Sequence, residues 1–171
     1  MRKLFSIIAI TALAALSGCV KNDLTLWTDS AVEFDAASWN TNANGVVYPI
    51  LNRVPAYGVA VNATNSPILL TRTTAPFQLR VNLVGPQSST DTPVSYRVVP
   101  GESTALAGVH YASLSGSLII PAKSSFGFIT ITPMNPGATS GSVILVLELT
   151  SGGKVNPSFN YAKVGLSIAQ N

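Results

Sequence analysis

The sequence predicts an all-β fold, a two-sheet antiparallel sandwich of seven to nine strands. Three observations support this fold class. The chain is rich in β-branched and turn-forming residues, with 13 Gly and 11 Pro among 171 residues, a mixture typical of short strands joined by tight turns. Several segments alternate apolar and polar residues, the pattern of a strand with one buried face. Turn signals separate these segments, and helix formers in periodic stretches are absent.

The first part of the predicted domain carries the weakest strand signals. Residues 31–35 fit a short strand, and the Asn-rich residues 39–45 predict a turn. Residues 46–51 and 56–61 are interpreted as strands interrupted by proline, and residues 68–71 are another short apolar run. Because proline cannot donate to a strand ladder, these prolines belong at sheet edges or bulges.

The clearest strand covers residues 77–84, in which Phe, Leu, Val and Leu alternate with Gln, Arg and Asn. One face of this strand is therefore buried and the other is in water. Residues 94–98 repeat the alternation, as expected in an antiparallel sheet. Further strands are predicted over residues 116–121, 126–132 and 162–168, the first two separated by a connection of hairpin length.

Residues 143–149 differ from the other predicted strands because nearly every position is apolar. Both faces of this strand must therefore be covered, including Ile144 and Val146. A central strand covered by its own domain explains the pattern, and an interface with a partner is the alternative.

The N-terminal segment has the parts of a bacterial export signal. Arg2 and Lys3 precede an apolar run over residues 4–16. This run is shorter than the roughly 20 apolar residues that a helix needs to cross a bilayer core. The sequence Leu16-Ser17-Gly18-Cys19 resembles the lipobox of bacterial lipoproteins. This resemblance implies that the Cys19 sulfur carries a diacylglyceryl group and that Cys19 becomes the acylated N-terminus.

The lipobox divides the chain into three parts. We expect a signal peptide over residues 1–18, a lipidated N-terminus and tether over 19–30, and the sandwich domain over 31–171. Residues 20–23 partly resemble a signal that sends some lipoproteins to the cell surface, and a plain polar tether is the alternative. We expect a lipid-anchored protein of the cell envelope, placed at the outer membrane, with the periplasmic or surface face left open.

Composition limits the partners. The ten Lys and Arg include Arg2 and Lys3, which leaves eight against seven Asp and Glu in the processed chain. The remaining basic residues are scattered, so we expect no nucleic-acid partner. Cys19 is the only cysteine, so no disulfide can form within the domain. The expected partners are the membrane, through the lipid anchor, and an envelope protein or a glycan.

Several segments resemble, in order and spacing, the Calx-beta family. They are a Gly-x-x-Tyr turn that ends the stretch 94–111, a Gly-x-apolar-x-apolar-Pro-Ala stretch over 116–122, and the strands 126–132 and 143–149. The resemblance spans residues 77–168 and implies an immunoglobulin-like sandwich. In calcium-binding members, loop Asp and Glu side chains hold the metal.

The calcium ligands of that family are missing from this sequence. His110 stands where the family has Asp, and Lys123 stands where it has Gly. No Asp or Glu occurs between Glu102 and Glu148. We therefore expect the fold without the calcium site, and no other metal or cofactor.

The chain also lacks the residue patterns of an enzyme. It has one His, no thiol besides Cys19, and seven carboxylates outside any recognisable motif, so we expect a non-catalytic protein. The first hypothesis is a lipid-anchored sandwich that serves protein interaction or a structural role. The alternative is a carbohydrate-binding surface lipoprotein. Aromatic rings and amides could then bind a sugar, and the candidate residues are Trp39, Asn40, Asn42 and Tyr48, with Trp27, Tyr57, Tyr111 and Tyr161 as further aromatic faces.

Overall fold

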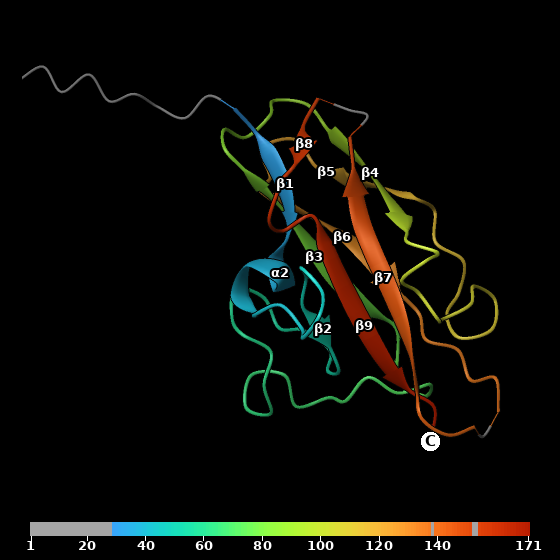
Figure 1. Ribbon diagram of the computed structural model, residues 1–171. Coiled ribbons are helices and arrows are strands. Elements are labelled where there is room, and N and C mark those ends of the chain that lie inside the picture. Colours follow the sequence, from blue (N-terminus) through green and yellow to red (C-terminus); the bar gives the residue numbers. More distant parts are fainter. Residues whose placement is uncertain (1–28, 138, 152–153) are drawn as a thin grey trace, which may run out of the picture.

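The protein folds as two β-sheets with one short helix in this computed structural model, which describes residues 29–137, 139–151 and 154–171 (Figure 1). One sheet has the strand order β6-β3-β1-β8 and the other β2-β9-β7-β4-β5. The prediction of an all-β, two-sheet sandwich of seven to nine strands is confirmed. The elements are β1 (Ala31–Phe34), α2 (Asp35–Trp39), β2 (Ile50–Leu51), β3 (Phe77–Val84), β4 (Thr92–Val98), β5 (Ser117–Ile120), β6 (Phe126–Ile131), β7 (Ser142–Thr150), β8 (Asn156–Pro157) and β9 (Lys163–Ala169).

The core lies between the sheets because strands of both present every second side chain inward. Burial alternates along β3 and β4, as the sequence pattern predicted. Leu79 and Val81 of β3 belong to one buried cluster with Leu145 and Leu147 of β7 and Leu166 of β9. The only cysteine of the chain, Cys19, lies outside the described residues. Apolar packing therefore holds the described domain together.

Two strand pairs differ from the predicted antiparallel arrangement. β8 pairs with β1 in parallel, and β2 pairs with β9 in parallel, whereas the other pairs between named strands are antiparallel. Both β2 and β8 are two-residue strands at sheet edges. Neither is joined to its partner by a hairpin turn, so no turn imposes an antiparallel direction.

Between β1 and β3 the structure has fewer strands than the sequence predicted. Only Ile50–Leu51 of residues 46–51 forms a strand, residues 56–61 form none, and the helix α2 was not predicted. Buried Asp35 begins α2, and its carboxylate accepts hydrogen bonds from Asn82 Nδ2 at 3.0 Å and from the Gly58 N–H at 2.9 Å. These bonds attach the loop after α2 to β3, in place of the ladder that a further strand would form.

The apolar strand β7 is covered by its own domain. It lies between β9 and β4, and Val146 is fully buried although its side chain points to the outer face of the sheet. The segment after β4 also runs beside β7, because Thr104 Oγ1 accepts the Ile144 N–H at 2.8 Å. The central-strand interpretation of this segment is therefore correct. Among the described residues, no helix is long and apolar enough to cross a membrane.

We predict that Gly127→Ala destabilises the sandwich. A Cβ at Gly127 would lie 2.6 Å from the Ile119 carbonyl oxygen, which is backbone and cannot rotate away. Overpacking of this kind costs about 1–3 kcal/mol of unfolding free energy, measurable by urea denaturation. The control is Gly101→Ala, since a Cβ there would meet nothing within 4 Å. Equal stabilities of the two variants would contradict the prediction.

Candidate functional site

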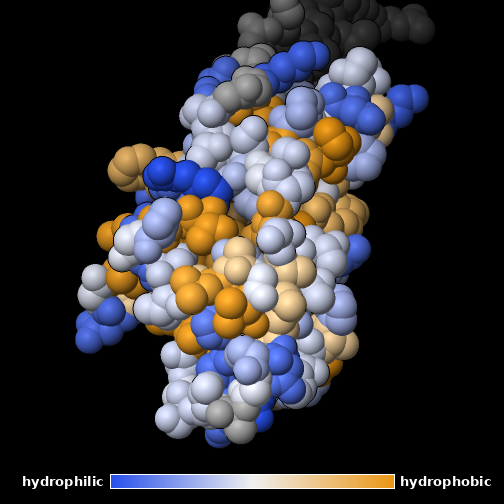
Figure 2. Space-filling view, turned by 90° about the vertical axis from the view of Figure 1, so that its right-hand side faces the viewer, coloured by the Kyte–Doolittle hydropathy of each residue, from blue (hydrophilic) through white to orange (hydrophobic). Residues whose placement is uncertain are grey.

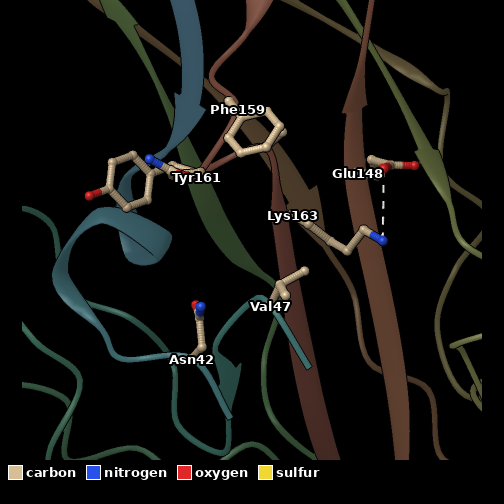
Figure 3. Close-up of a pocket in the computed structure, with 8 residues that line it drawn as sticks. Asn42, Val47, Glu148, Phe159, Tyr161 and Lys163 are labelled. Carbon is tan, nitrogen blue, oxygen red and sulfur yellow. Dashed lines mark ion pairs between the residues drawn. The ribbon is translucent and has the colours of Figure 1, made fainter. Parts of the chain in front are cut away.

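A pocket of about 580 Å³ opens on the outer surface of the five-stranded sheet. Its walls are the loop before β2, the connection between β8 and β9, and the outward side chains of β7 and β9. Figure 3 shows Lys163 extending toward Glu148, with Phe159 on one side of the opening and Val47 and Asn42 on the other. The lining residues are Asn42, Val47, Glu148, Phe159, Asn160, Tyr161, Ala162 and Lys163.

The connection between β8 and β9 is fixed by backbone hydrogen bonds to β1. Ser158 N donates to Val32 O at 2.8 Å, and Phe34 N donates to Tyr161 O at 2.9 Å. Between these two anchor points, the Phe159 side chain is 100% exposed. A firmly held backbone thus presents a phenyl ring entirely to solvent. Exposing apolar surface to water is unfavourable, and contact with a ligand would remove it from water.

Charged side chains form a row across three strands below this ring. Arg97 on β4 contacts the Glu148 carboxylate on β7 through Nη2 at 2.6 Å and Nε at 2.8 Å. Lys163 on β9 lies 3.8 Å from the other oxygen of Glu148 and 2.9 Å from Glu102 Oε1. Strand register causes the row, because Glu148 is the Cα partner of both Arg97 and Lys163. Two cations and two carboxylates therefore balance one another.

Tyr48 supports the charged row from beneath. It is buried, and Lys163 Nζ lies 5.3 Å from the centre of its ring. The ring fits against the bare backbone of Gly165, where a Cβ would come within 3.4 Å of Tyr48 Cε2 and 3.0 Å of Ile50 Cγ1. Burial, followed by the interaction with the Glu102 carboxylate, raises the pKa of Tyr48 to about 12. The same phenol, followed by Lys163, lowers the pKa of Glu102.

The four predicted ligand-binding residues do not lie together in the structure. Asn42 lines the pocket, and Tyr48 lies under Lys163. Trp39 is half-exposed and is not part of the lining. The Asn40 side chain is used within the fold, because Nδ2 donates to Ala36 O at 2.7 Å and Oδ1 accepts the Val61 N–H at 2.9 Å. Cys19, the predicted lipid-attachment residue, lies outside the described residues.

Several pocket residues were not predicted from the sequence. The adjacent residues Phe159, Asn160 and Tyr161 carry a local signal, an aromatic–amide–aromatic run, of which only Tyr161 was considered as a sugar-stacking ring. Glu148 and Lys163 carry no such signal. They meet only because β7 and β9 pair in one particular register.

His110 and Lys123, which depart from the Calx-beta pattern, do not suit a calcium ion. His110 Nδ1 accepts the Leu106 N–H at 2.9 Å and so closes a turn. Lys123 occupies the tip of the β5–β6 connection at a φ of 60°, and its ammonium would repel a cation. The described part of the chain brings no three His, Cys, Asp or Glu side chains together as a metal site.

The pocket offers groups that suit the binding of a ligand. Its charged residues Glu148 and Lys163 are held in ion pairs. Together with the aromatic and amide groups of the lining, they can contribute packing and hydrogen bonds to a ligand.

We predict that Tyr48 makes folding stability fall between pH 10 and pH 12. The unfolded phenol loses its proton near pH 10 and the folded one near 12, so rising pH favours the unfolded state over this interval. Tyr48→Phe retains the ring and removes the hydroxyl group that titrates. Urea unfolding at neutral pH, pH 10 and pH 12 should therefore give the variant a shallower decline than the wild type. Parallel pH profiles would contradict this assignment.

Comparisons with known proteins give limited information. No protein-family model and no curated protein matches the chain. It is similar to the solved calcium binding domain CBD12 of CALX1.1 (TM-score 0.49, 18% identity, 58% of this chain and 40% of that chain) and to CBD12 from CALX1.2 (0.46, 19%, 58% and 40%). It is also similar to the apo-form Calx CBD1 domain (0.47, 20%, 58% and 87%). The match thus spans less than half the length of the first two, and such low TM-scores and identities carry no information about what this chain binds.

Proposed function

We propose that this protein is a lipid-anchored lipoprotein of the cell envelope whose non-catalytic β-sandwich binds another envelope protein. The anchoring part of the proposal is supported by the sequence alone, through the basic start, the short apolar run and the lipobox-like Leu16-Ser17-Gly18-Cys19. Two or more acyl chains on Cys19 would hold the domain stably at a membrane, because each buried methylene contributes about 0.8 kcal/mol.

The observation that supports a protein partner is an apolar surface at one turn. Leu106 is 59% exposed, Val109 41% and Met134 37%. Backbone bonds from Val109 N to Leu106 O and from Met134 N to His110 O bring these three residues together, and we call them the turn patch. Figure 2 views the side that carries β4 and the connection after it in Figure 1, and apolar side chains gather in the middle of that face. Contact with a partner would remove this surface from water.

A carbohydrate-binding surface lipoprotein is the second candidate. The pocket favours it, because the lining combines two aromatic rings with the amides of Asn42 and Asn160. The two candidates use separate surfaces, the turn patch for a protein and the pocket for a glycan, so substitutions can test them independently.

We predict that Cys19→Ser abolishes lipidation and processing. Mass spectrometry of the wild type should show a chain that begins at Cys19 with acyl mass added. The variant should keep residues 1–18 and carry no acyl mass, because serine lacks the sulfur nucleophile. Ser17→Ala keeps a small residue before the cysteine and serves as the control. An unmodified thiol at Cys19 in the wild-type protein would disprove the lipid anchor.

We predict that charge in the turn patch removes the protein partner. Tagged full-length protein, crosslinked in cells and purified from solubilised envelope, should retain a specific partner that Leu106→Glu loses. Val47→Glu is the matched control, since Val47 is 78% exposed beside the pocket and away from the turn patch. Both variants should keep the wild-type thermal midpoint. Identical captured proteins for wild type and Leu106→Glu would refute a partner at this surface.

A further inference from the structure

We propose that the pocket takes an uncharged saccharide, with one sugar ring lying against Phe159 and its hydroxyls directed to Glu148, Lys163 and the two lining amides. This inference rests on the carbohydrate-binding candidate above and specifies its site and its ligand class. The pocket volume of about 580 Å³ falls in the range typical of small-ligand sites, roughly 300–1,000 Å³.

The apolar side of the pocket matches the face of a sugar ring. Phe159 is fully exposed, Val47 is 78% exposed and Tyr161 is 37% exposed. The C–H face of a pyranose is apolar and slightly positive, and the face of an aromatic ring is negative. Because bonds at Ser158 and Tyr161 hold the backbone on either side of Phe159, the chain that carries this ring is already ordered before a sugar packs on it.

The polar side of the pocket offers paired donors and acceptors. Lys163 Nζ lies 3.8 Å from Glu148 Oε1, beyond hydrogen-bond distance, although the two form an ion pair. A carboxylate oxygen that accepts and an ammonium that donates are therefore neighbours, which suits adjacent hydroxyls that each donate and accept. The amides of Asn42 and Asn160 add a donor and an acceptor each.

The charge balance of the pocket favours an uncharged ligand. Glu148 is already paired with Arg97, and Lys163 with Glu102. A charged ligand would have to compete with one of these existing partners, because neither Glu148 nor Lys163 is left without an opposite charge. Hydroxyl groups can bond to the row without separating any pair.

The position of Lys163 is also set before a ligand arrives. Its ammonium is held over the Tyr48 ring and against Glu102. Tyr48 in turn fits the space left by the missing side chain of Gly165. Tyr48 and Gly165 are therefore positioning residues, and the ring lies under the row instead of reaching the ligand.

The test uses full-length protein in a sugar-free detergent. A panel of neutral hexopyranose oligosaccharides (gluco-, galacto-, manno- and N-acetylglucosamine series) and of uronate oligosaccharides is screened, and hits are titrated by calorimetry. We expect binding to at least one neutral series, no uronate binding of comparable affinity, and an affinity reduced at least tenfold in Phe159→Ala. The control is Phe126→Ala, which removes a partly exposed ring of the opposite sheet and should bind as wild type.

Three results would overturn the inference: no neutral oligosaccharide binds, uronates bind as well or better, or Phe159→Ala binds like the wild type. Asn42→Ala provides a second variant should Phe159→Ala lower the thermal midpoint, and we expect it to weaken binding severalfold. Acylation of Cys19 and partner capture through the turn patch are measured separately. A failure of sugar binding would therefore not count against the lipoprotein and protein-interaction proposals.

Discussion

The contact between the Tyr48 ring and the bare backbone of Gly165 supports the whole outer surface on which the pocket is built. Gly165 is the Cα partner of Val146 on one side and of Ile50 on the other. A flat ring can therefore approach the sheet where β9 has no side chain. This packing covers β9 at Gly165, next to the segment after β4 that covers β7, and it also provides the surface on which Lys163 rests. Stability of the sheet and shape of the pocket thus have one common cause.

The outer surface carries balanced charges and exposed apolar side chains. The charged row across β4, β7 and β9 is internally balanced, so it contributes little long-range attraction for ions. Apolar side chains, among them Phe159 and the turn patch, are instead exposed on the domain surface. Such a surface suits recognition by close packing and hydrogen bonding at contact range.

The sandwich could be predicted from sequence because strand alternation is a local signal. β3 and β4 show it clearly, and their buried and exposed positions follow the pattern. The region between β1 and β3 could not be predicted, because side-chain bonds of Asp35 and Asn40 replace strand pairing there. The composition of the Asn-rich turn beside Trp39 did not reveal that Asn40 caps α2 while Asn42 lines the pocket.

The candidate site was harder to predict than the fold because it depends on long-range register. Glu148 meets Lys163 and Arg97 only when β4, β7 and β9 are aligned, and nothing in the neighbouring sequence indicates that alignment. Of the pocket residues, Asn42 was predicted as a ligand-binding residue and Tyr161 only as an aromatic face. Phe159 and Asn160 belong to an aromatic–amide–aromatic run that could have been recognised in the sequence.

The parallel pairing of β2 with β9 has a kinetic consequence. Ile50 can pair with Gly165 only after the whole segment between them has been synthesised, and β1 likewise waits for β8. Contacts between such distant segments raise the contact order and slow folding, because a long loop must close before the pairing repays its entropy. On the proposed export route, a nascent chain that cannot complete either sheet early would stay unfolded until β8 and β9 have crossed the membrane.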